Sequence, residues 1–257
     1  MITTAALVER FDRLGVRPGM VLHVQASLRA LGPVEGGAAG VVDALCEVLG
    51  PDGTLVAYTA TPENSSTSRI HQEAVAGLSP AEAEAHRARM PRFDPAATPA
   101  SPTMGALSEA VRTRPGALRS GHPQTSWAAL GPRAEEITAS HPLTSHLGPE
   151  SPLGRLYELD ARVLMLGVGM ARLTAFHLAD LRQPGVRLRE YRCVAPEGWT
   201  TFQAPDLDDL HFAELGERVL SAATGVSSAR IGAADCLLVP VREAVDLADG
   251  FLRRARG

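Results

Sequence analysis

The sequence has no lysine, few aromatic residues and only three cysteines. All 25 of its basic residues are arginine, against 29 acidic residues, which gives a formal net charge of −4. A mildly acidic chain does not attract a phosphate backbone, but it tolerates cationic ligands. Aromatic residues make up 4% of the chain, which leaves few platforms on which nucleic-acid bases could stack. The composition therefore argues against a nucleic-acid partner.

Cysteine spacing and the lengths of the apolar runs exclude further classes of protein. Cys46, Cys193 and Cys236 are scattered and form no C-x-x-C pair, which argues against a disulfide framework and a thiolate zinc site. No apolar run reaches the roughly eighteen residues that a membrane-spanning helix requires. Residues 1–10 become charged too early for a secretory signal. We therefore expect a cytoplasmic globular protein without a membrane segment.

Strand and helix patterns alternate along the 257 residues, which predicts a single domain of α/β class. The run at 162–168 is continuously apolar, as is typical of a strand covered on both faces of a sheet. The other strands are expected at 20–24, 54–58, 126–130, 188–194, 199–203 and 236–240. Helices are expected at 5–14, 40–49, 103–112, 133–140, 173–182, 208–223 and at the end of the chain.

The regular pattern stops between residues 62 and 102. This stretch is polar, rich in proline and serine, and contains one helix candidate at 80–90. A long irregular segment inside a compact domain is usually a lid or a binding loop. We therefore predict that 62–102 is an insertion on the substrate side of the domain.

The strand at 162–168 ends in a glycine-rich turn that leads into a helix containing His177. Backbone N–H groups at a helix start bind anions, and ligands of α/β sheets lie beyond the carboxyl ends of strands. Arg172 replaces the third glycine of a dinucleotide fingerprint, which argues against a nicotinamide site. His177 fits a general base, a ligand or a hydrogen-bonded core residue. It stands three residues before Asp180, but no second His-x-x-x-His cluster supports a metal site.

Two other segments carry groups suited to chemistry. Asp206, Asp208 and Asp209 precede a predicted helix, where carboxylates cap the helix start, and where one of them could orient an imidazole. The stretch 119–126 combines a cation, hydroxyls and a histidine, which fits either a phosphate or pantetheine grip or a plain loop. The Gly-x-Ser-x-Gly elbow of a hydrolase and the P-loop pattern are both absent.

A series of short sequence blocks spans nearly the whole chain in a fixed order. The blocks occupy residues 14–19, 26–32, 49–56, 93–99, 119–123, 148–153 and 163–169, and they lead to Thr174-Ala175-Phe176-His177. Together they resemble the aminoglycoside 3-N-acetyltransferase family of antibiotic N-acetyltransferases. The resemblance implies an α/β fold particular to that family, with a mixed central sheet flanked by helices. It does not imply the commoner split-sheet acetyltransferase fold.

The resemblance also implies an activity and its residues. Acetyl-CoA would be the donor, the 3-amino group of an aminoglycoside the acceptor, antibiotic resistance the result, and no metal would take part. His177 closes the family's Thr-x-x-His motif and would be the base, with Asp209 (or Asp208, one place away) as its acidic partner. Thr174 or backbone amides beside Gly169 would stabilise the oxyanion. Coenzyme A is expected at Ser27, Leu28, Arg29, Arg119, Ser120, His122, Ser126 and Gly169. The cationic acceptor is expected at Glu63, Asp94 and Asp180.

The sequence departs from the family pattern at two places. The first loop reads Gln25-Ala26-Ser27, where the family often has His-Ser-Ser or His-Ala-Ser, and Asp180 stands where glutamate is usual. Two alternatives therefore stay open, namely a biosynthetic N-acetyltransferase acting on another amine and a coenzyme-binding homologue without catalysis. The sequence fixes neither regioselectivity nor oligomeric state, a homodimer being one option.

Overall fold

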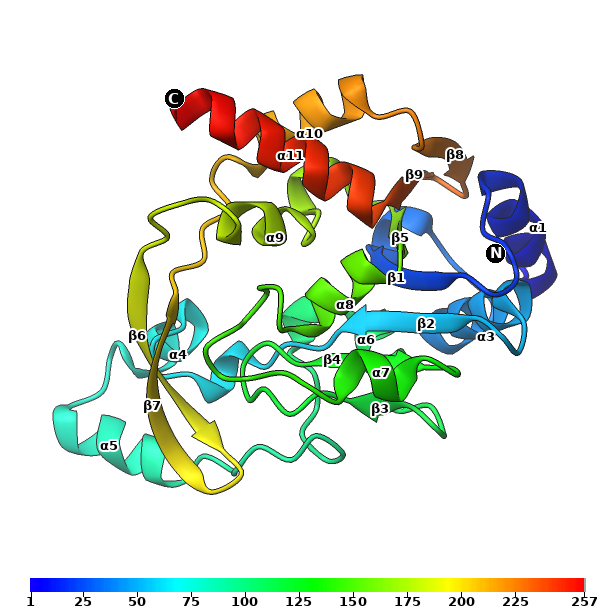
Figure 1. The fold of residues 1–257 in the computed structure, drawn as a ribbon. Helices are drawn as coiled ribbons and strands as arrows, with labels where there is room; N and C mark the ends of the chain where they lie inside the picture. The colour runs from blue at the N-terminus through cyan, green and yellow to red at the C-terminus, as the bar shows by residue number, and fades with distance from the viewer. Residues whose placement is uncertain (257) are drawn as a thin grey trace.

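A mixed β-sheet with helices on both faces forms the centre of the computed structural model, which describes residues 1–256 (Figure 1). The seven strands of this sheet in the described chain have the order β3-β4-β2-β1-β5-β9-β8. Strand β1 is parallel to β2 and β5, whereas β4 and β9 run antiparallel to their neighbours. The strands are β1 (Val21–Ala26), β2 (Thr54–Tyr58), β3 (Leu118–Arg119), β4 (Trp127–Leu130), β5 (Arg162–Leu166), β8 (Ser227–Ile231) and β9 (Ala234–Pro240). The mixed sheet expected from the sequence is confirmed.

Helices cover the sheet in two layers, each with its own apolar core. One layer contains α1 (Thr4–Leu14), α3 (Gly37–Leu49) and α6 (Ala106–Arg112). The opposite layer contains α7 (Ala134–Thr138), α8 (Pro152–Glu158), α9 (Phe176–Leu181), α10 (Phe212–Ala222) and α11 (Val241–Arg256). Shorter pieces are α2 (Leu28–Leu31), α4 (Arg69–Val75), α5 (Pro80–Ala88), η1 (Pro62–Asn64), η2 (Pro102–Met104) and η3 (Met170–Arg172).

Strand β5 contributes side chains to both cores. Leu164 and Leu166 pack into the core under α1 and α3, while Val163 and Met165 pack into the opposite core, and all four are fully buried. Successive side chains of a strand point to opposite faces, so a strand covered on both sides has to be apolar throughout. The prediction that this run is a two-sided central strand is confirmed.

The end of β5 is held close to α2. Gly167 has a φ of +65°, and a Cβ added there would lie 2.8 Å from the Cβ of Ala30. Glycine is therefore required at this turn by both the backbone conformation and the lack of space. The chain then forms η3 before α9 begins at Phe176, three residues later than the sequence indicated. The predicted helix at 208–223 also starts late, at Phe212, because residues 206–209 have no regular secondary structure and residues 210–211 form a turn.

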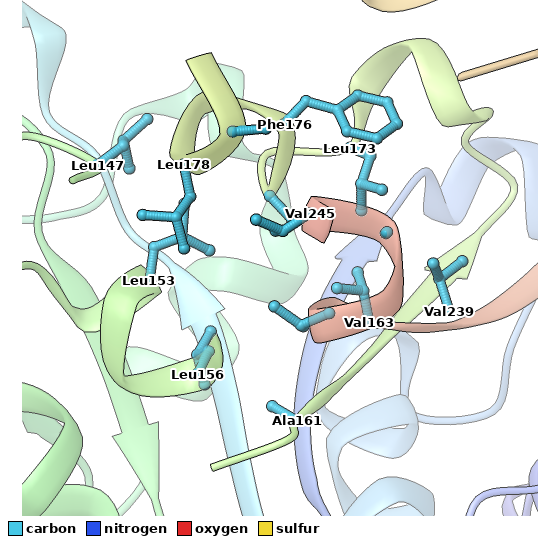
Figure 2. Close-up of a cluster of buried hydrophobic side chains, with 14 of the residues drawn as sticks. Leu147, Leu153, Leu156, Ala161, Val163, Leu173, Phe176, Leu178, Val239 and Val245 are labelled. Carbon is cyan, nitrogen blue, oxygen red and sulfur yellow. The ribbon is translucent and has the colours of Figure 1, made fainter. Parts of the chain in front are cut away.

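The short helix α9 is fixed by its packing. Leu178 extends from α9 toward Leu153 of α8 in the core shown in Figure 2, and both side chains are fully buried. Phe176 packs edge-on against Phe212 of α10, with ring centroids 5.4 Å apart. A helix of six residues is marginal by itself, so these contacts decide where the helix lies.

Leu178→Ala will lower the free energy of unfolding by about 2–5 kcal/mol, because it leaves a cavity in a closely packed core. Urea unfolding at neutral pH measures this loss. Leu220→Ala is the matched control, since Leu220 is 44% exposed on α10 and its truncation leaves no cavity. Equal midpoints for Leu178→Ala and the unaltered protein would show that α9 is not anchored by this contact.

The segment 62–102 is more regular than its composition indicated. It contains η1, α4 and α5, of which only α5 was predicted. A two-stranded hairpin of β6 (Leu188–Ala195) and β7 (Gly198–Pro205), expected from the sequence and confirmed, lies beside α4 and α5 (Figure 1). The Ser66 N–H donates to the carbonyl oxygen of Arg192 at 2.9 Å, and the indole of Trp199 donates to the carbonyl of Arg87 at 3.3 Å. The hairpin thus holds the segment in place.

Candidate active site

A cavity of about 500 Å³ opens beyond the carboxyl ends of the parallel strands β1, β2 and β5. Gln25 and Ala26 contribute from the end of β1, Tyr58 from the end of β2, and Val168 from the turn after β5. Open α/β sheets bind ligands at this edge, and the volume suits a small-molecule ligand. The rest of the wall consists of Val24, Thr103, Met104, Ser108, Ala171, Arg172, Thr174, His177, Asp209 and Phe212.

His177 lies in the first turn of α9 with its imidazole in the wall of this cavity. Its ring packs against Phe212, with centroids 4.7 Å apart, and its Nδ1 is buried without a hydrogen-bond partner among residues 1–256. Burial lowers the pKa of His177 to about 4, while the Asp209 charge raises it, His211 lowers it and Asp208 raises it. The imidazole is therefore neutral at pH 7 and able to accept a proton.

Thr174 lines the cavity one helical turn before His177. Its carbonyl oxygen accepts the His177 N–H at 3.1 Å, and its own N–H donates to Oε1 of Gln25 at 3.2 Å. Because the backbone N–H is engaged, the hydroxyl is the donor that this residue can offer to an oxyanion. Thr174 and His177 therefore line the same cavity, and the role of Thr174 at the oxyanion stays a prediction.

Asp209, the expected acidic partner of His177, makes no hydrogen bond to the imidazole within the described chain, and its role stays a prediction. The Asp209 carboxylate lies 4.0 Å from the Arg172 guanidinium, and these side chains are 59% and 75% exposed. Asp208 instead accepts the backbone N–H of Leu210 at 2.8 Å. Asp209 therefore acts on the imidazole through its charge, which raises the pKa of His177, and not through a direct hydrogen bond.

A second cavity, of about 300 Å³, also has His177 in its wall. Asp180, Asp206 and Asp208 line it together with Arg187, whose guanidinium lies 2.6 Å from the Asp206 carboxylate, so carboxylates outnumber cations in its wall. Asp180 accepts a hydrogen bond from Nε2 of His211 at 2.9 Å. The other lining residues are Leu181, Gly185, Val186, Arg187 and Leu207. The sequence predicted Asp180 at this place but gave no role to His211, which the fold brings there from the segment before α10.

Two other carboxylates expected near the acceptor lie elsewhere. Glu63 accepts a hydrogen bond from the Ser101 hydroxyl at 2.6 Å and lines a separate, largely apolar cavity. Asp94 accepts the backbone N–H of Ala96 at 2.8 Å and of Ala97 at 3.3 Å, so it stabilises a local turn. Neither side chain lines a cavity that contains His177.

The loop at 119–126 is largely internal in this structure, and its role in coenzyme binding stays a prediction. Ser120, His122 and Ser126 are completely buried. Arg119 donates to the carbonyl oxygen of Thr59 at 2.6 Å and to the Ser126 hydroxyl at 3.0 Å, and it also bonds to the carbonyl of Thr98. Ser120, His122 and Ser126 have no solvent-exposed surface and reach a ligand only if the loop rearranges, whereas Arg119 is partly exposed and lines another cavity. The sequence showed residue types here that suit ligand binding, but the same residue types also form hydrogen bonds inside a protein.

The remaining expected coenzyme ligands flank the larger cavity. Ser27 is the N-cap of α2, and Leu28 and Arg29 form its first turn, directly after Ala26 in the cavity wall. Gly169 is exposed in the turn between β5 and η3. These four residues lie next to the cavity and remain predicted coenzyme contacts.

Residues 1–256 contain no group of three or more His, Cys, Asp or Glu side chains placed to hold a metal ion. Within the same residues, no helix is both long and apolar enough to cross a membrane. Fold and cavities together define an α/β protein in which one neutral histidine, His177, lies in the walls of two cavities.

Sequence comparisons place the chain in a family. The profile of the family described as Aminoglycoside 3-N-acetyltransferase matches residues 23–253. The chain is 32% identical over 252 residues to the SPbeta prophage-derived aminoglycoside N(3')-acetyltransferase-like protein YokD of Bacillus subtilis (strain 168), covering 96% of this chain and 91% of YokD. It is 36% identical over 211 residues to aminoglycoside N(3)-acetyltransferase VIII of Streptomyces fradiae, covering 80% and 72% of the two chains.

Structural comparisons agree with this placement. The crystal structure of YokD matches with a TM-score of 0.90 at 30% identity, covering 98% of this chain and 93% of YokD. AAC-IIIb, solved as a binary complex with CoASH, matches with a TM-score of 0.83 at 32% identity, covering 98% and 97%. The chain belongs to the aminoglycoside 3-N-acetyltransferase family. The family, the fold and the class of enzyme expected from the sequence, an acetyl-CoA-dependent acetyltransferase, are confirmed.

Proposed function

We propose that this protein transfers the acetyl group of acetyl-CoA to the 3-amino group of an aminoglycoside, with His177 as general base. The observation that carries the proposal is that His177 is shared by two cavities of different character. The larger one, at the strand ends, suits the acetylated end of the coenzyme, and the acidic one suits a cationic amino sugar. Coenzyme A bound to AAC-IIIb and the activity named for the Streptomyces fradiae relative support the same pair of substrates.

The chemistry follows from the neutral state of the imidazole. An aminoglycoside amine is mostly protonated at neutral pH, and it loses this first proton to solvent before it attacks. As the amine nitrogen then bonds to the thioester carbon, His177 accepts its second proton. The carbon–sulfur bond then breaks, the carbonyl re-forms, and the leaving thiolate takes the proton from the imidazolium. The Thr174 hydroxyl is placed to stabilise the oxyanion, and the Asp209 charge favours the imidazolium.

The hairpin and the segment 62–102 form the acceptor side of a single domain in this proposal. Arg187, in the wall of the acidic cavity, lies directly before β6, so that cavity continues into the hairpin. The guanidinium of Arg189 in β6 donates to the Thr67 carbonyl of the segment at 3.0 Å. The segment is therefore bonded to the hairpin whose first strand begins directly after the acidic cavity.

Thiol release from acetyl-CoA tests the proposal directly. The purified protein should release thiol with aminoglycosides that carry a 3-amino group and not with those that lack it. Release with a different amine only would move the acceptor to another class of compound. Binding of coenzyme A without release on any amine would overturn the proposal in favour of a non-catalytic homologue.

Asp180→Asn is expected to raise the KM for the aminoglycoside about 5–30-fold, because it removes one carboxylate from the acidic cavity beside His177. Salt should raise the KM of the unaltered protein, and raise that of Asp180→Asn less, since salt screens the remaining charges. Glu63→Gln is the matched control and should leave the KM unchanged, because Glu63 lines a different cavity. Steady-state rates at two salt concentrations measure both effects, and equal responses of the two variants would contradict the assignment of the acidic cavity.

A further inference from the structure

The side-chain amide of Gln25 joins the end of β1 to the turn that precedes α9. Its Nε2 donates to the carbonyl oxygen of Arg172 at 2.7 Å, and its Oε1 accepts the N–H of Thr174 at 3.2 Å. One amide thus uses both its donor and its acceptor on two backbone groups of the same turn. These partners are 147 and 149 positions away along the chain.

The turn held by Gln25 carries the reactive groups of the site. The Thr174 carbonyl oxygen accepts the His177 N–H at 3.1 Å. Thr174 is thus bonded to Gln25 through its N–H and to His177 through its carbonyl. Arg172, whose carbonyl Gln25 also binds, has its guanidinium 4.0 Å from the Asp209 carboxylate. Gln25 is therefore one contact away from the base His177, through Thr174, and one contact away from the Asp209 charge, through Arg172.

This turn lacks the usual means of fixing a helix start. The N-cap of α9 is Ala175, which has no side-chain capping hydrogen bond, and Gly169 before η3 has none either. The first N–H groups of α9 donate instead to backbone carbonyls of the preceding turn, those of Phe176 and His177 to Leu173 and Thr174. The start of a short helix then depends on where that turn lies, and Gln25 in β1 is hydrogen-bonded to two of its residues.

We propose that Gln25 is a positioning residue for acetyl transfer: its amide fixes the 172–174 turn so that the His177 imidazole and the Thr174 hydroxyl keep their orientation toward the thioester. The inference rests on acetyl transfer at His177. It also explains how glutamine functions at this position, because a donor and an acceptor on one planar amide match a carbonyl and an N–H two residues apart. By engaging the Thr174 N–H, Gln25 leaves the hydroxyl as that residue's oxyanion donor.

Two substitutions separate positioning from direct contact with the coenzyme, since Gln25 also lines the cavity. Gln25→Met keeps the length of the side chain but forms neither bond. Gln25→Glu keeps the acceptor for Thr174 and sets a carboxylate oxygen against the Arg172 carbonyl. We expect kcat to fall about 10–100-fold in both variants. The Kd for coenzyme A should stay within about twofold, because the amide is used on the protein backbone.

Gln183→Met is the matched control, because Gln183 binds the other end of the same helix. Its Nε2 donates to the Ala179 carbonyl at 3.0 Å and to the Asp249 carboxylate at 2.7 Å, and it does not line the cavity. Its loss should lower the thermal midpoint but leave kcat nearly unchanged at a temperature below that midpoint. An equal fall of kcat in Gln183→Met would show that any loosening of α9 lowers the rate, and would overturn a specific role of Gln25.

An NMR titration of the His177 ring tests, without turnover, whether the two hydrogen bonds of the Gln25 amide clamp the 172–174 turn. In the unaltered protein the His177 ring is expected to stay neutral down to the pH at which the protein unfolds, because burial lowers its pKa. In Gln25→Met the ring should begin to take up a proton above that pH, as the freed turn lets water reach it. Unchanged kcat and an unchanged titration would overturn the inference, as would a coenzyme Kd that weakens as much as kcat falls. If no amine is acetylated but the titration shifts, the clamp stands and the proposed function fails.

Discussion

His177→Ala will lower kcat about 10²–10⁴-fold while leaving the Kd for coenzyme A nearly unchanged. The size of the loss is that of a positioned proton acceptor. Burial holds the pKa of His177 at about 4, so the imidazole is neutral at pH 7 and ready to accept the proton of the attacking amine. Thiol-release rates at saturating acetyl-CoA give kcat, and calorimetric titration with coenzyme A gives the Kd.

Rescue by added imidazole identifies the missing proton transfer. Without a base, the rate should follow the fraction of unprotonated amine, and log kcat should rise with a slope of about 1 below the amine pKa. Imidazole added to the solution should restore part of the rate in His177→Ala, where space is open. It should not do so in His177→Gln, whose side chain fills that space. If kcat and coenzyme affinity fall together, His177 is structural and another group is the base.

Much of the fold could be predicted because its signals are local. The apolar run at 162–168 reflects burial of β5 on two faces, and the turn at Pro196-Glu197-Gly198 separates the paired strands β6 and β7. The missed elements give weak local signals. Helix α8 and strand β8 are short, and most side chains of β8 at the sheet edge are exposed, so neither shows a clear apolar period.

Of the candidate site, only the residues that lie close together in the sequence could be predicted. The glycine turn, Thr174 and His177 follow each other in sequence, so their common place in the cavity could be read from spacing. The hydrogen bond of His211 to Asp180 spans 31 positions and that of Gln25 to Arg172 spans 147, and neither leaves a trace in local spacing. Whether a polar side chain points outward or inward is likewise set by tertiary packing, as the buried His122 shows.

Acidification should unfold the protein at a pH well above the range in which carboxylates titrate. Burial lowers the pKa of His23, His141 and His177 to about 4 and that of His146 to about 3, from an ordinary value of 6.5, and it holds the pKa of His122 well below that value. The His146 ring, with its centroid 4.6 Å from that of His122, also lowers the pKa of His122. Each of these rings is kept neutral in the folded protein.

Proton linkage gives the sign and the size of the change in the free energy of unfolding with pH. Between about pH 6.5 and pH 4 the unfolded chain binds protons that the folded protein does not, so the free energy of unfolding falls as the pH falls through that window. A ring with a folded pKa of about 4 contributes a loss on the order of 2 kcal/mol at pH 5. Several such rings together approach the roughly 5–15 kcal/mol that stabilises a typical domain, so we expect cooperative unfolding near pH 5.

Urea unfolding at pH 7.5, 6 and 5, followed by the fluorescence of the fully buried Trp127, measures the fall directly. His146→Met is the informative variant, because His146 packs against Tyr191 at 4.4 Å, and its Nε2 is buried without a hydrogen-bond partner in the described chain. An apolar side chain there removes one proton-binding site of the unfolded chain, so the midpoint should depend less steeply on pH. A urea midpoint that is the same at pH 5 and pH 7.5 would mean that these rings already carry their protons in the folded protein.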